Sequence, residues 1–270
     1  MTANDSEFVG GLARGLSVLE CFDKANSELT LSDVAKRTGL SPASVRRSLI
    51  TLEKLGYVRR IGRTFFLSAR VLTLGAVYLR SAQSEDLLLP ELQRLVGLFG
   101  DSASVATLDR GKILYVAHYS EQRAKRMMAT VGTTFPAYAT SLGKVMLSGL
   151  SPDAFKAYLD HVSFERLTDR TILQQSALSA CVDECRANGF ATSVDELDYG
   201  ITSLAVPVRN DQHKIVAALN CSAYTGRVSS AELIDQRLEE LRESSFKVAQ
   251  ILQRHPALLH SLYPGVGPAS

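Results

Sequence analysis

The segment spanning residues 30–67 constrains the fold most, because its helix and turn signals follow one another in a fixed order. Thr30 is suited to cap the N-terminus of a helix that ends near residue 38. Gly39 can take the left-handed conformation that closes a helix, and Ser41-Pro42 supplies a side-chain cap and a preset first turn for the next one. Two helices joined by a short turn that contains glycine predict a helix-turn-helix.

The second helix of this motif has an apolar side and a basic, hydroxyl-rich side. Val45, Leu49 and Leu52 recur at helical spacing and should attach it to a core. Arginines on the opposite side can make paired hydrogen bonds to guanine edges in the major groove, while hydroxyls contact phosphates and other base edges. The alternative is an ordinary charged helix face, but such faces usually mix both signs of charge.

Elements on both sides of the motif complete a winged domain. A preceding helix over residues 12–22 has an apolar stripe formed by Leu12, Leu16, Leu19 and Phe22. Two short strands are predicted at residues 57–60 and 64–67, and such a hairpin is a wing whose arginines lie along the DNA backbone or minor groove. The predicted DNA-binding residues are Ser41, Ser44, Arg46, Arg47, Ser48, Thr51, Arg60 and Arg63.

The distribution of charge also indicates a nucleic-acid partner. The chain has a formal net charge of +2, but residues 31–80 alone hold 10 lysines and arginines against 2 acidic residues. Such a block neutralises phosphates, so double-stranded operator DNA is the expected partner. A winged domain that contacts only protein is the competing interpretation, and it predicts no salt-sensitive affinity for DNA.

The segment over residues 69–84 predicts a linker helix that is apolar on all sides. A helix of this kind must be covered, and a small winged domain has little surface with which to cover it. The same helix of a second subunit would cover it, so we expect a homodimer that reads two half-sites of a palindromic operator.

The remainder of the chain predicts an α+β domain with a mostly antiparallel sheet, because strand-like runs alternate with helical ones. The predicted division is 1–68 for the DNA-binding domain, 69–84 for the linker, 85–257 for the effector domain and 258–270 for a flexible tail. Strands are predicted at residues 103–108, 112–119, 127–131, 190–194, 204–209 and 215–223, and helices at 86–99, 141–147, 152–159, 173–188 and 229–254.

Motifs that carry catalysis or metal binding are missing from the sequence. It contains no nucleophile elbow, zinc-protease motif, phosphate-binding loop or dinucleotide fingerprint, and Cys181 with Cys185 fits an apolar helix stripe better than a metal site. We therefore expect no catalytic residues, metal or cofactor. An enzyme with an accessory winged domain is the alternative, in which the hydroxyl-rich residues 138–141 would line an active site and the fold would bring His118 near.

The chain is also expected to be a cytoplasmic protein with no membrane contact. No run approaches the roughly 20 apolar residues of a spanning helix, and the N-terminus is polar. The four cysteines should then remain thiols in a reducing compartment.

Several segments of the sequence resemble the IclR family of transcriptional regulators over residues 11–254. The similarity is closest to the branch that controls protocatechuate, 4-hydroxybenzoate and β-ketoadipate catabolism. The segments that carry it are GLARGLSVL at 11–19, the helix-turn-helix at 31–58, FLSARVL at 66–72, PAYATSLGK at 136–144, LTDRT at 167–171, ELDYG at 196–200 and AVPVR at 205–209.

This resemblance implies a GAF-like effector domain, a dimer or dimer of dimers, and a small organic acid as effector. A carboxylate would bind the free N–H groups at the helix start over residues 140–142. Thr202 stands where the family pattern suggests arginine, which favours an aromatic monoacid over a β-ketoadipate-like diacid. The effector-binding residues that the resemblance implies are Tyr138, Ser141, Leu142, Ser193, Ser203, Asn220 and Ser222.

Overall fold

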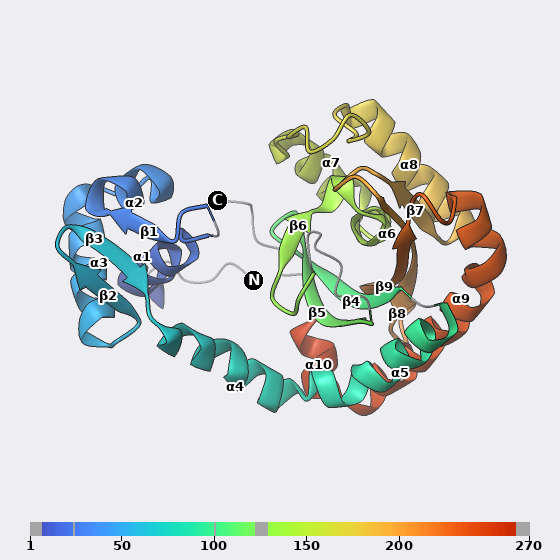
Figure 1. The fold of residues 1–270 in the computed structure, drawn as a ribbon, viewed down its shortest axis with the longest axis horizontal. Helices are drawn as coiled ribbons and strands as arrows, with labels where there is room; N and C mark the ends of the chain where they lie inside the picture. Colours follow the sequence, from blue (N-terminus) through green and yellow to red (C-terminus); the bar gives the residue numbers. More distant parts are fainter. Residues whose placement is uncertain (1–6, 24, 100, 122–128, 263–270) are drawn as a thin grey trace. The chain divides into compact units, whose positions relative to one another are not determined.

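The computed structural model describes residues 7–23, 25–99, 101–121 and 129–262 (Figure 1). The chain forms two compact units, Met1–Tyr78 and Leu79–Ser270. They divide within the helix α4 (Leu72–Ala82), inside the segment over residues 69–84 that the sequence marks as a linker. Within the described part of the chain, no helix is both long and apolar enough to cross a membrane.

The N-terminal unit is a winged helix-turn-helix, as predicted. Thr30 caps α2 in a reciprocal capping box with Asp33, and Gly39 closes that helix with a φ of 67°. The described strands of this unit pair antiparallel in the order β1-β3-β2, and β1 is a short strand that the sequence analysis did not predict. The elements are α1 (Gly10–Glu20), β1 (Glu28–Thr30), α2 (Leu31–Thr38), α3 (Pro42–Lys54), β2 (Val58–Ile61) and β3 (Thr64–Leu67).

The predicted apolar stripe of the first helix packs against the core at Leu19 and Phe22 but not at Leu12 and Leu16. Val18 is the fully buried residue of α1 and packs with Val34, Val45 and Leu49, whereas Leu12 and Leu16 are 65% and 46% exposed. The helix therefore meets the core through its C-terminal half. The unit therefore leaves apolar side chains of α1 exposed to solvent.

The connector between the wing and the second unit is also apolar and exposed. A short 3-10 turn, η2 (Ala69–Val71), leads into α4. Along α4, Leu72, Leu74 and Val77 are all exposed, with Leu72 at 76%. These apolar side chains, predicted to need a cover, are thus exposed to solvent within a single chain.

The C-terminal unit is the predicted α+β domain with an antiparallel sheet (Figure 1). Its described strands follow the order β6-β5-β4-β9-β8-β7, and every neighbouring pair is antiparallel. The strands are β4 (Ser102–Asp109), β5 (Lys112–Ser120), β6 (Thr134–Pro136), β7 (Ala191–Val194), β8 (Ile201–Arg209) and β9 (Ile215–Tyr224).

Helices cover the two faces of this sheet. The helices α5 and α9 pack on one face, and α6 packs on the other face with α8 against it. This second face holds the larger core cluster, in which Leu142, Met146, Leu178 and Val182 are almost completely buried. The bounds are α5 (Ser84–Phe99), η3 (Ala137–Ala139), α6 (Ser141–Ser148), α7 (Pro152–His161), α8 (Gln175–Asn188), α9 (Ser230–Arg254) and α10 (Pro256–Ser261).

Two predictions for this unit are wrong. The first residues of the tail predicted at 258–270 belong to the helix α10, and Leu258 and Leu262 are fully buried. The Leu262 carbonyl accepts a hydrogen bond of 2.7 Å from Thr107. Residues 263–270 lie outside the described residues. For the strand predicted at 127–131, residues 127 and 128 also lie outside them, residues 129–131 are irregular, and the edge strand is β6.

Candidate functional site

The exposed side of α3 presents most of the residues predicted to contact DNA. Arg46, Arg47 and Thr51 are exposed, and Ser48 is half-buried between them. Ser41 caps the helix by accepting a hydrogen bond from the backbone N–H of the third helical residue. That third residue, Ser44, is only 7% exposed, so it offers DNA much less surface than its neighbours on α3.

The wing adds two exposed arginines beside this helix. Arg60 is held in place, since its Nε donates to the Gly62 carbonyl at 2.9 Å and its guanidinium lies 5.6 Å from the centre of the Phe65 ring. Arg63 lies in the turn of the hairpin, next to the exposed Ile61. The wing is therefore a pre-shaped basic projection suited to a phosphate backbone or a minor groove.

The C-terminal unit contains a cavity of about 170 Å³ between the sheet and the start of α6. A row of serines crosses its floor, because the register places Ser120, Ser102, Ser222, Ser203 and Ser193 opposite one another on successive strands. Residues directly opposite each other in neighbouring strands share one face of a sheet. The hydroxyls of this serine row therefore all face the cavity.

A second polar row lies beside the serine row. The register places His118, Ser104 and Asn220 opposite one another on β5, β4 and β9. The Ser104 hydroxyl lies 2.9 Å from Nδ1 of His118, and burial lowers the pKa of His118 below its usual value. Burial therefore favours the neutral imidazole, which has one donor and one acceptor nitrogen.

The start of α6 forms another wall of this cavity. The Thr140 hydroxyl accepts a hydrogen bond of 2.9 Å from the Gly143 N–H, and the Ser141 hydroxyl bonds to the Ser203 hydroxyl at 2.8 Å. The backbone N–H groups of Ser141 and Leu142 precede the first intrahelical bonds, and no described residue accepts from them. Free N–H groups at a helix start favour an anionic ligand.

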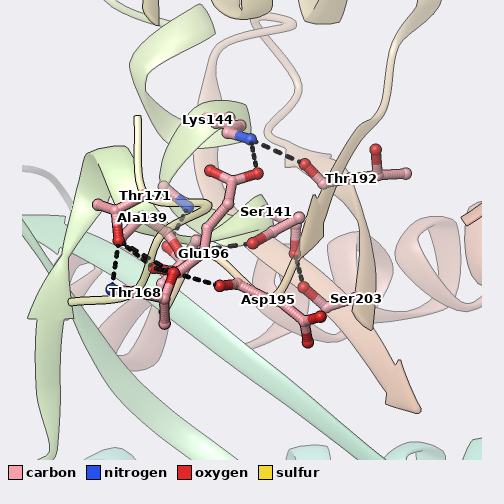
Figure 2. Close-up of polar contacts among 12 residues, drawn as sticks. Ala139, Ser141, Lys144, Thr168, Thr171, Thr192, Asp195, Glu196 and Ser203 are labelled. Carbon is pink, nitrogen blue, oxygen red and sulfur yellow. Dashed lines mark hydrogen bonds and ion pairs between the residues drawn. The ribbon is translucent and has the colours of Figure 1, made fainter. Parts of the chain in front are cut away.

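A buried ion pair holds α6 against the loop between β7 and β8 (Figure 2). Lys144 Nζ donates to Oε1 of Glu196 at 2.6 Å and to the Thr192 carbonyl at 3.0 Å. The Glu196 carbonyl accepts a hydrogen bond of 2.8 Å from Thr171. This loop supplies Leu197 and Gly200 to the cavity, so the ion pair fixes one wall of it.

Comparisons with known proteins match both units. The IclR helix-turn-helix domain matches residues 11–62, and the bacterial transcriptional regulator IclR C-terminal domain matches residues 77–250. The chain belongs to the IclR family.

Some relatives within the IclR family carry names that belong to the branch that the sequence resembles. The chain is 36% identical over 242 residues to the Pca regulon regulatory protein of Pseudomonas putida, covering 89% of this chain and 83% of that protein. It is 34% identical over 251 residues to the p-hydroxybenzoate hydroxylase transcriptional activator of Acinetobacter baylyi, covering 91% and 93%.

A solved structure of an IclR effector domain is also similar to the C-terminal unit. It is a double mutant of the PobR inducer-binding domain from Acinetobacter in complex with 3-hydroxybenzoic acid. The identity is 32%, the TM-score is 0.55, and the match covers 59% of this chain and 94% of that one.

The predicted effector residues of this IclR protein separate into two groups. Ser141, Ser193, Ser203, Asn220 and Ser222 line the cavity. Tyr138 and Leu142 instead lie in the core: the Tyr138 ring packs 5.0 Å from Phe164 while its hydroxyl donates to the Glu165 carbonyl, and Leu142 is fully buried. The side chains of Tyr138 and Leu142 therefore do not line the cavity, and Leu142 can contribute to an effector site only through its backbone N–H.

The structure adds cavity residues that the sequence analysis missed. Ser102, Ser104 and Ser120 line the cavity, and the signal that could have found them is the spacing of two along each strand. His118, which the sequence analysis considered only for the enzyme alternative, lines it too. Thr202 does not line the cavity, because its hydroxyl donates to Thr225 at 2.9 Å on the opposite side of β8. Its identity therefore does not set the charge that the IclR effector meets.

Proposed function

We propose that this IclR regulator binds operator DNA through α3 and the β2–β3 wing, and that an aromatic monocarboxylate in the effector cavity controls that binding. The observation that carries the effector assignment is the cavity, which combines free helix N–H groups with the serine row in a volume of about 170 Å³. A cavity on the order of 150 Å³ holds a benzene ring. One helix start suits one carboxylate, which favours a monoacid over a diacid.

The relatives support an aromatic effector. One is named after p-hydroxybenzoate hydroxylase, and the similar PobR domain is bound to 3-hydroxybenzoic acid. We propose the same chemical class for this chain, and control of genes for aromatic-compound catabolism as the consequence. The relatives are transcriptional regulators, which leaves the enzyme alternative without support.

Replacing Arg47 by alanine should weaken specific operator binding by about 1 to 3 kcal/mol, or roughly five- to hundredfold in Kd, if the guanidinium reads a base. Arg47 is exposed near the start of α3, and the described residues offer it no acidic partner. Fluorescence anisotropy with labelled DNA from beside the protein's own gene measures the change. The loss should be much smaller on unrelated DNA, because phosphate contacts remain.

The matched control is Arg166→Ala, which removes an exposed arginine from the other unit and should leave both affinities unchanged. An unchanged affinity of Arg47→Ala for the operator would contradict the assignment of α3 as the reading helix. An equal loss on operator and unrelated DNA would assign Arg47 to phosphate binding alone.

Saturating hydroxybenzoate should raise the melting temperature of the protein. A ligand at a hundred times its Kd stabilises the folded state by about 2.7 kcal/mol, which corresponds to roughly 5–10 °C for a unit of this size. Differential scanning fluorimetry with 3- and 4-hydroxybenzoate measures the shift, with phenol as the control that lacks the carboxylate. If no aromatic acid shifts the melting temperature of a protein that binds its operator, the effector assignment fails.

We further propose that the protein works as a homodimer or a dimer of homodimers. The exposed apolar residues Leu12 and Leu16 on α1 and Leu72 and Val77 on α4 are the kind of surface that a second copy covers. A dimer would present two copies of α3 to a palindromic operator. Residues 1–68 would then be the DNA-binding domain, 69–84 the linker and 85–257 the effector domain, in a cytoplasmic protein.

A further inference from the structure

The second polar row of the cavity contains an acceptor that lacks a partner. Asn220 is 4% exposed and lines the cavity, and its Nδ2 donates to the Ser222 hydroxyl at 3.3 Å. Its Oδ1 is buried without a hydrogen-bond partner among the described residues. A buried polar atom without a partner is costly, and a ligand hydroxyl would satisfy it in either orientation of the amide, because a hydroxyl both donates and accepts.

His118 supplies another polar group at the other end of the same row. Its Nδ1 is engaged by Ser104, while Nε2 has no partner among the described residues. Because burial lowers the pKa of His118 and so favours the neutral imidazole, the ring suits an uncharged hydroxyl better than a carboxylate. The ring of Tyr115 meets the imidazole edge-on at 6.4 Å and limits its movement.

The sheet register places these two groups around one point. Two strand spacings, about 10 Å, separate the backbones of His118 and Asn220, with Ser104 between them. A hydroxyl above Ser104 is therefore within reach of both side chains. Another two strand spacings separate β4 from Ser203 on β8, which lies beside the start of α6. A single substituted benzene ring can span this distance.

We propose that His118 and Asn220, with Ser104 between them, bind a ring hydroxyl of the effector and so make the cavity selective for hydroxylated benzoates over benzoate itself. This inference rests on the proposed effector function. The carboxylate lies at the start of α6, the hydroxyl lies over Ser104, and the apolar Ala129, Phe135 and Leu197 surround the ring.

Isothermal titration calorimetry on the full chain with 3-hydroxybenzoate, 4-hydroxybenzoate and benzoate tests this selectivity. The wild type should bind at least one hydroxybenzoate about tenfold or more tightly than benzoate. Benzoate lacks the ring hydroxyl, so it would leave the polar groups of His118 and Asn220 without a hydrogen-bond partner. In Asn220→Leu and in His118→Phe this preference should fall below about threefold, while benzoate binds as in the wild type or more tightly.

Two further variants separate ligand binding from folding. His118→Gln keeps hydrogen-bonding capacity and should retain part of the preference, and it replaces His118→Phe if circular dichroism shows that the phenylalanine variant is unfolded. His161→Phe makes the same change at an exposed histidine on α7 and should alter neither affinity.

The outcomes distinguish a failure of this inference from a failure of the proposed effector function. If the wild type binds benzoate as tightly as both hydroxybenzoates, or if the variants lose all three acids equally, the hydroxyl-reading role is overturned and the effector function stands. If the wild type binds none of the three acids, the effector function itself fails and the selectivity fails with it.

Discussion

Replacing Gly143 with alanine should destabilise the protein by about 3 kcal/mol or more, at or above the upper end of the usual cost of overpacking. A Cβ atom at this position would lie 1.9 Å from the carbonyl oxygen of Ala137 and 2.5 Å from its carbonyl carbon. Both atoms belong to the backbone of η3, so no side chain can turn aside. The helix α6 and η3 would have to separate, which would open the core around Leu142.

Urea denaturation of the full chain measures this loss, and Gly97→Ala provides the control. Gly97 also lies inside a helix, α5, but a Cβ there meets nothing within 4 Å. That variant should be as stable as the wild type or more stable by up to about 1 kcal/mol, because alanine favours the helix. If Gly143→Ala unfolds at the wild-type urea concentration, the close approach of α6 to η3 is refuted.

Replacing Lys144 with methionine should destabilise the protein by about 3 to 5 kcal/mol, because it leaves the Glu196 carboxylate buried without its cation. Burial already raises the pKa of Glu196, against the opposing effect of Lys144, so removing the lysine should raise it further. A carboxyl group whose pKa is higher in the folded state than in the unfolded state contributes stability that is fully present at pH values below its unfolded-state pKa. This contribution is lost as the pH rises through the folded-state pKa. The deficit of the variant should therefore be smallest near pH 5 and grow toward pH 8.

Thermal melts at a series of pH values test this prediction. Adding Glu196→Leu to the Lys144→Met variant should recover much of the loss, because an apolar pair no longer leaves a buried charge alone. Lys247→Met breaks an exposed pair with Glu243 on α9 and should leave the melting temperature almost unchanged. A deficit that does not change with pH would show that lost packing, and not the carboxylate, is responsible.

Features set by neighbours in the sequence could be predicted closely. The caps at Thr30 and Ser41 begin α2 and α3 as expected, and Gly39 ends α2. Each of these signals acts within one helical turn, so no knowledge of the tertiary structure is needed.

Features that depend on distant contacts could not be predicted in the same way. The helix α10 replaces the predicted tail because Thr107, far away in the sequence, binds the Leu262 carbonyl. Ser44 on α3 and Leu142 on α6 are two further examples. The sequence pattern predicted the first turn of each helix correctly, but the burial of individual side chains in that turn depends on neighbours that are distant in the sequence.

The effector cavity was predicted only in part for a related reason. Ser203 and Ser222 could be nominated individually from family resemblance, whereas their alignment with Ser102 and Ser120 exists only through the strand register. The contribution of His118 likewise depends on its place opposite Ser104. An irregularity between β4 and β5 next to this region, where the pair Val105–Ala117 is followed by Ala106–Tyr115, also shifts the register in a way that the period of two does not predict.

The serine row has a consequence for how such regulators diversify. Each hydroxyl stands on a backbone that the ladder of its neighbours already secures, so exchanging serine for alanine, cysteine or threonine redraws the chemical pattern under a ligand without re-pairing a strand. Recognition of a new inducer can accordingly evolve by single codon changes on a constant scaffold, and a biosensor designer has the same freedom.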